Sequence, residues 1–191
     1  MSIGYLAFEQ VRDVKGIKQI IKVAFAVDGR TVVTEFVKPD FVTEVSFATN
    51  EDGIPMSRIV SLISSAIDQY DVRTMYALQV LPRSMTSALK SHDVTIVDMR
   101  SYLASKVVTY RSSTFDNVFN YMFRLPLPAR CEELTLAVKH VVDRLSTVAT
   151  YYMEGLYCQP NRCTARLEKG IRCTNRVVRY GKCARCNIIM S

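Results

Sequence analysis

Glycine and proline are scarce in this sequence, with 7 and 6 among 191 residues. This low content excludes collagen-like repeats and disordered linkers rich in glycine and proline. No apolar run reaches the roughly 18 residues that a membrane-spanning helix needs. The opening MSIGYLAFEQVRDVK lacks the basic and long apolar regions of a secretory signal. We therefore expect an intracellular protein, not secreted and with no membrane partner.

The length of 191 residues accommodates one domain of ordinary size and a short appendage, but not two full domains. We expect an α/β body over residues 1–155 and a small basic zinc-binding module over residues 156–191. In a reducing compartment, cysteines of such a module act as metal ligands rather than as disulfide partners.

In the body, strand patterns come first. Residues 17–37 contain two β-branched runs separated by Asp28-Gly29, a strong hairpin signal because the turn needs positive φ at both central residues. A further strand over residues 3–8 would make three. The remaining expected elements are a helix at 55–70, a strand at 74–81, a short helix at 82–90, a strand at 94–99, a loop-rich cover at 102–128 and a long helix at 131–153. This order predicts a mixed sheet with an antiparallel hairpin and packing helices.

Charge is distributed very unevenly along the chain. Eight of the 25 basic residues but only one of the 18 acidic residues lie from Cys158 onward. The whole net charge of +7 therefore belongs to residues 158–191, which we call the basic segment, and the body is neutral. This asymmetry is typical of a protein that binds a polyanion at one end.

The basic segment also holds five of the six cysteines. Cys183-Ala-Arg-Cys186 has a spacing that lets both sulfurs reach one metal ion, and a tetrahedral zinc site needs two more ligands. We prefer the set Cys163, Cys173, Cys183 and Cys186, with Cys158 as an alternative ligand. Either set leaves no open position for water, so we expect one structural zinc ion. Since so short and polar a segment cannot fold by burying apolar area, metal binding would supply its folding energy.

The stretch CTARLEKGIRCTNRVVRYGKCARC resembles a short zinc-binding motif found in proteins of large DNA viruses and phages. The residues at the motif positions are Cys163, Ala165, Lys169, Gly170, Cys173, Gly181, Cys183 and Cys186. The chain has one residue fewer between Gly181 and Cys183, and it has Cys186 where histidine is usual. The resemblance covers about an eighth of the chain. It implies zinc and a viral origin, and hence a location in the cytoplasm or nucleus of a host cell.

The opening YLAFEQV, followed by IIKVAFAVDGR, resembles the start of the DEDD 3′–5′ exonucleases, which have an RNase H-like fold. In that family the first strand supplies two of the carboxylates that hold a metal pair. Aligning Phe8-Glu9 with the family's Phe-Asp puts Val11 at the second carboxylate position. In the last helix only Glu132 or Glu133 could replace the final Asp. The carboxylate set is thus incomplete, and we expect no exonuclease activity and no other catalytic residues.

These patterns favour a nucleic-acid-binding accessory protein that contacts phosphates of DNA or RNA through its basic segment. The alternative is a structural or assembly protein whose zinc module contacts another protein or a second copy; an active exonuclease ranks below both. No small-molecule substrate is indicated. The candidate nucleic-acid contacts are Arg162, Arg166, Lys169, Arg172, Arg176, Arg179, Tyr180, Lys182 and Arg185.

Overall fold

A computed structural model describes residues 1–12, 18–38, 53–108 and 114–153. The chain divides into two compact units, Met1–Tyr151 and Tyr152–Ser191. Of the second unit only Tyr152 and Met153 belong to the described residues. The predicted boundary at residues 155 and 156 therefore lies outside them.

The first unit is built on a five-stranded mixed sheet with the order β3-β2-β1-β4-β5. β2 is antiparallel to both β1 and β3, whereas β4 is parallel to β1 and β5 is parallel to β4. The turn between β2 and β3 has φ of 49° at Asp28 and 90° at Gly29, which confirms the predicted hairpin. The strands are β1 (Ser2–Arg12), β2 (Lys18–Val27), β3 (Arg30–Phe36), β4 (Val72–Ala77) and β5 (Thr95–Asp98).

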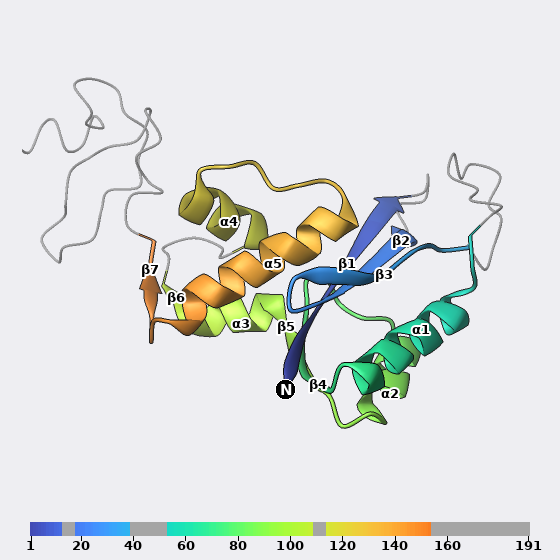
Figure 1. The fold of residues 1–191 in the computed structure, drawn as a ribbon. Coiled ribbons are helices and arrows are strands. Elements are labelled where there is room, and N and C mark those ends of the chain that lie inside the picture. Colours follow the sequence, from blue (N-terminus) through green and yellow to red (C-terminus); the bar gives the residue numbers. More distant parts are fainter. Residues whose placement is uncertain (13–17, 39–52, 109–113, 154–191) are drawn as a thin grey trace, which may run out of the picture. The chain divides into compact units, whose positions relative to one another are not determined.

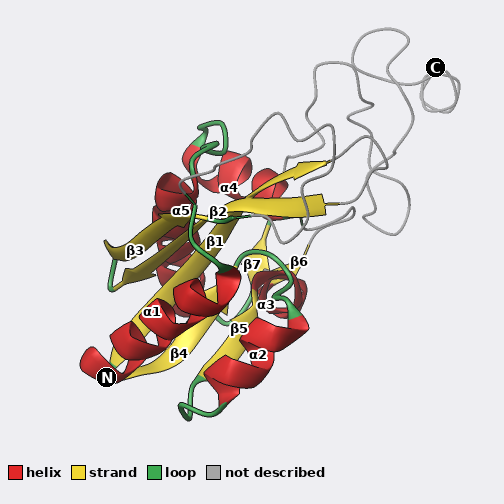
Figure 2. Cartoon of the chain, turned by 90° about the vertical axis from the view of Figure 1, so that its right-hand side faces the viewer, coloured by secondary structure: helices red, strands yellow, loops and turns green. Residues whose placement is uncertain are grey.

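Helices cover both faces of this sheet (Figure 1). On one face, α1 (Met56–Gln69) and α2 (Arg83–Lys90) bury residues such as Ile63 and Met85 against Leu6, Phe8 and Phe25, and Figure 2 shows both helices on this side. On the other face, α5 (Cys131–Ser146) packs on the small residues Ala7 and Ala24. Because successive side chains of a strand point to opposite faces of the sheet, neighbouring residues of β1 pack against different helices.

Two sequence expectations need correction. The long helix ends at Ser146, not at residue 153, and Tyr151–Tyr152 forms the short strand β7, which pairs with β6 (Val107–Val108). β-branched and tyrosine residues after Ser146 favour extended structure over helix. The expected loop-rich cover instead contains most of α3 (Met99–Lys106) and all of α4 (Phe115–Phe123).

The described helices are all too short or too polar to cross a membrane.

Candidate functional site

The predicted zinc ligands and nucleic-acid contacts of the basic segment all lie outside the described residues. The structure therefore leaves Cys158, Cys163, Cys173, Cys183 and Cys186, together with the eight cations and Tyr180, as predictions from sequence. Within the described part of the chain, the densest group of ligand-type side chains lies where β1 meets the start of α5.

Glu9 stands in β1 at a register shift between Glu9 and Gln10. Its Oε1 accepts a hydrogen bond of 2.9 Å from the backbone N–H of Cys131, the first residue of α5. The residue before it, Arg130, makes no side-chain cap of its own. Glu9 thus satisfies one of the free N–H groups at the helix start and places a negative charge at its positive end.

Two hydrogen bonds from one side chain hold the backbone next to Glu9 in place. Gln79, two residues beyond the end of β4, accepts a hydrogen bond from the Phe8 N–H and donates one to the Phe8 carbonyl, both at 3.0 Å. This amide continues the pairing of β1 with β4 past the last backbone pair. It therefore holds the position from which Glu9 reaches α5.

Glu132 carries the second carboxylate. Its Oε1 accepts hydrogen bonds from Lys22 Nζ at 2.5 Å and from Thr34 Oγ1 at 2.8 Å. Lys22 is directly opposite Glu9 in the β1–β2 register, so both side chains leave the same face of the sheet. The Lys22 ammonium also lies 4.9 Å from the centre of the Phe36 ring.

The surroundings keep Glu132 ionised. Burial alone would raise the pKa of this carboxyl, but the hydrogen bonds from Lys22, its own backbone N–H and Thr34 outweigh burial and lower the pKa from 4.5 to about 2. Cys131 responds in the opposite way. Burial, followed by the charges of Glu132 and Glu9, raises the pKa of its thiol, so the thiol stays protonated and is a poor nucleophile.

We call Glu9, Lys22, Thr34, Cys131 and Glu132 the carboxylate cluster. Oxygen atoms of Glu9 and Glu132 and the sulfur of Cys131 all lie within 4.8 Å of one another, with Cys131 Sγ 3.5 Å from Glu132 Oε2. For all three side chains to ligate a metal ion the thiol would have to lose its proton, and Glu132 Oε1 is already bonded to Lys22 and Thr34. As it stands, the lysine supplies the positive charge.

The exonuclease comparison left Glu132 or Glu133 as the partner of Glu9, and the structure places Glu132 beside Glu9. Glu133 is exposed on the next position of α5. Lys22 and Thr34 were not predicted. The available signal was Lys22 itself, because a charged residue inside the apolar run IIKVAFAV needs a partner when the strand is packed.

Other titratable side chains of the described residues have local structural roles. Asp98 caps α3 by accepting hydrogen bonds from the Ser101 N–H at 3.1 Å and the Ser101 hydroxyl at 2.9 Å. His140 lies beside the Phe123 ring at 6.1 Å between ring centres.

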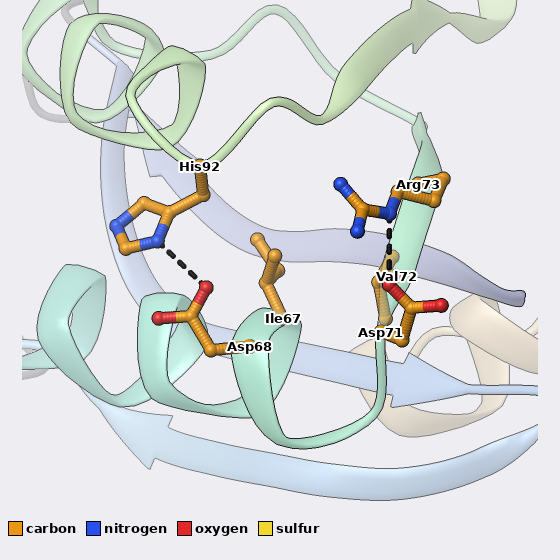
Figure 3. A pocket seen from close by; sticks show the side chains of 6 residues that line it. All are labelled: Ile67, Asp68, Asp71, Val72, Arg73 and His92. Carbon is orange, nitrogen blue, oxygen red and sulfur yellow. Dashed lines mark hydrogen bonds and ion pairs between the residues drawn. The ribbon is translucent and has the colours of Figure 1, made fainter.

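His92 borders a small pocket of about 150 Å³ on the sheet's α1 side (Figure 3). Its Nδ1 lies 2.9 Å from Asp68 Oδ1. On the opposite side of this pocket, Arg73 pairs with Asp71 at 2.8 Å and with Asp93 at 3.3 Å. Since the basic groups of this pocket already face carboxylates, it offers an anion little free positive charge.

A larger cavity of about 470 Å³ opens beyond the carboxyl end of β4. Open α/β sheets commonly bind ligands beyond the carboxyl ends of their parallel strands. Leu78 connects the cavity with the carboxylate cluster, because it packs on the group that contains Ala7 and Cys131. The lining is mainly apolar and comprises Leu78, Met99, Arg100, Leu103, Ala104, Thr114 and Phe115.

Replacement of Glu132 provides a test of the ion pair. We expect Glu132→Gln to lower the free energy of unfolding by about 2 kcal/mol at neutral pH, because a charge-assisted hydrogen bond is lost. The folded pKa of Glu132 is depressed, so its contribution is fully present above 4.5 and is lost as pH falls through about 2. Urea denaturation at several pH values should show the difference from wild type shrinking towards acid.

Glu133→Gln is the matched control, since Glu133 is exposed on the same helical turn. It should change stability by less than about 0.5 kcal/mol. If the Glu132→Gln difference stayed constant or grew as the pH was lowered, the ion pair would not be its source.

No protein-family model matches the chain, and no curated protein matches its sequence.

Proposed function

We propose that this chain is a zinc-containing nucleic-acid-binding accessory protein of viral origin, with an RNase H-like body that does not cleave its ligand. The single observation behind this proposal is the placement of charge. All of the net charge of +7 falls in a 34-residue segment that also contains five cysteines. A zinc-folded module of this composition displays its arginines and lysines to phosphates.

The body supports the second part of the proposal. Its strand order, β3-β2-β1-β4-β5 with β2 antiparallel, is consistent with the RNase H-like fold suggested by the exonuclease resemblance. The exonuclease resemblance aligns Glu9 with the first carboxylate of those enzymes and leaves Glu132 or Glu133 for the last. Two-metal catalysis needs cations held between carboxylates, whereas here Glu132 is paired with Lys22 and Glu9 caps α5.

The proposal predicts that zinc and oligonucleotide binding depend on the same segment. The intact protein should contain one zinc ion by elemental analysis and should bind labelled oligonucleotides in fluorescence anisotropy. A chain truncated after Leu156 should do neither. Within the full chain, Cys183→Ser/Cys186→Ser removes two predicted ligands but no cationic side chain, and should also abolish zinc binding.

Single cysteine substitutions distinguish the two predicted sets of zinc ligands. Cys158→Ser should leave the zinc content intact if Cys163, Cys173, Cys183 and Cys186 bind the ion, whereas Cys173→Ser should remove it. The reverse result would establish the alternative set.

Other outcomes of this test identify other functions. Equal binding by the intact and truncated chains would locate nucleic-acid binding in the body and overturn the proposal. A salt-insensitive oligomer with no oligonucleotide affinity would favour an assembly protein. Magnesium-dependent degradation of the oligonucleotide would show that the body is an active nuclease.

A further inference from the structure

The carboxylate cluster contains its own cation. Lys22 Nζ contacts Glu132 Oε1, and Lys22 is the cross-strand neighbour of Glu9. The side chains of Lys22 and Glu132 are 17% and 28% exposed, so water screens this pair less than it screens a surface ion pair. The other side-chain partners of Glu132, the Thr34 hydroxyl and the Cys131 thiol, are neutral.

The charges of the cluster nearly cancel. Two carboxylates face one ammonium and the positive end of α5, which is equivalent to about half a unit charge. The Cys131 thiol adds no charge while it is protonated. The hydrogen bond with Glu132, opposed by burial and aided by the charges of Glu132 and Glu9, raises the pKa of Lys22, so this lysine remains an ammonium ion.

We propose that the Lys22 ammonium is the resident cation of the carboxylate cluster and occupies the role that a divalent metal ion would otherwise take between Glu9 and Glu132. The ligand atoms are already assembled, with two carboxylates and one sulfur within 4.8 Å of one another. A divalent ion entering this space would meet the positive charge of Lys22 and would have to compete for the Glu132 oxygen that Lys22 and Thr34 share.

This inference is independent of the basic segment, because all five residues of the cluster belong to the sheet and α5. It attributes the exclusion of a divalent ion from the cluster to one side chain. Removing the charge of Lys22 while keeping its length should therefore uncover a latent metal site.

Mn²⁺ is the appropriate probe, because it prefers carboxylate and water ligands over the thiolates of the basic segment. Binding to the full chain would be measured from the electron paramagnetic resonance signal of free Mn²⁺. We expect Lys22→Met to bind one additional Mn²⁺ at least about tenfold more tightly than wild type, the ratio corresponding to one favourable charge interaction. Lys22→Met/Glu9→Gln should lose this ion, because one of the two carboxylates is neutral.

Lys22→Gln serves as a second variant, since its amide can still donate a hydrogen bond to Glu132 and so preserves the local structure. It should also gain Mn²⁺. Circular dichroism would confirm that each variant is folded before its metal content is interpreted. A folded Lys22→Met or Lys22→Gln chain that gains no Mn²⁺ would overturn the inference.

A second readout compares the wild-type chain with Lys22→Gln by nuclear magnetic resonance. Bound Mn²⁺ broadens nearby amide resonances, and the Cys131 N–H lies within hydrogen-bonding distance of Glu9. In wild type this resonance should remain sharp at Mn²⁺ concentrations that broaden it in Lys22→Gln. Broadening in wild type at the same concentration, abolished by Glu9→Gln, would show that Lys22 does not exclude the metal.

Discussion

Duplex DNA binding by the intact protein should fall about 10⁴-fold when monovalent salt is raised from about 50 to 200 mM. The basic segment carries eight cations and one acid, and each phosphate contact releases close to one condensed counterion. If all eight cations contact phosphates, a plot of log affinity against log salt should have a slope of about −7. Fluorescence anisotropy titrations at four or five salt concentrations would give this slope.

Replacing single arginines with alanine tests whether the salt dependence comes from phosphate contacts of the basic segment. Arg176→Ala or Arg179→Ala should reduce the magnitude of the slope by about one and weaken binding to all sequences alike. Arg58→Ala is the matched control, since Arg58 is an exposed cation of the neutral body, and it should leave the slope unchanged. Preserved affinity with an altered preference between sequences would contradict backbone binding through these arginines.

Phe25→Ala should lower the free energy of unfolding by about 3–5 kcal/mol, the range for removing a fully buried phenylalanine. Phe25 is 0% exposed in β2. Its ring lies over the backbone of Gly4 in β1, where an added Cβ would be only 2.7 Å from Phe25 Cε2. An aromatic ring over a strand glycine is a recurrent packing device. Urea denaturation followed by circular dichroism measures the loss.

The contact between Phe25 and Gly4 can be tested by combining Phe25→Ala with a substitution at Gly4. Gly4→Ala alone should cost about 1–3 kcal/mol through overpacking. In the Phe25→Ala background the added methyl enters vacated space and only Val72 Cγ1, at 3.2 Å, remains close, so most of this cost should disappear. A double-mutant cycle isolates this coupling. Strictly additive losses would show that the ring does not determine which residue fits at position 4.

Sequence patterns predicted those elements whose causes are local. The Asp28-Gly29 turn requires only its two residues, and α1 shows a regular apolar stripe that includes Ile59, Ile63 and Ile67. The missed helix α4 has a similar signal in Phe115, Val118 and Phe119, with Thr114 as its N-cap. Abundant aromatics there suggested a loop-rich cover, although their spacing of three and four residues is helical.

The carboxylate cluster could be predicted only in part. Comparison with a family pattern pointed to Glu9 and to either Glu132 or Glu133, but the proximity of Glu9 and Glu132 depends on the way α5 lies across β1 and β2. Lys22 reaches Glu132 across 110 residues of sequence. No periodicity along the chain encodes such a pairing, because it arises from strand register and helix placement together. The sequence therefore predicted an incomplete carboxylate set, and the position of Lys22 in an apolar run did not reveal that its partner is Glu132.

The position of β1 has a consequence for the order in which the sheet forms during synthesis. β1 is made before the other strands, yet it becomes the middle strand. Its antiparallel partner β2 follows almost directly, whereas the parallel contact of Ser2 with Val72 spans seventy residues. At translation rates of about 5–20 residues per second, the meander of β1, β2 and β3 is complete seconds before β4 exists. During that interval one edge of β1 has no strand beside it, and a nascent chain of this protein would offer that edge to chaperones or to a second nascent chain.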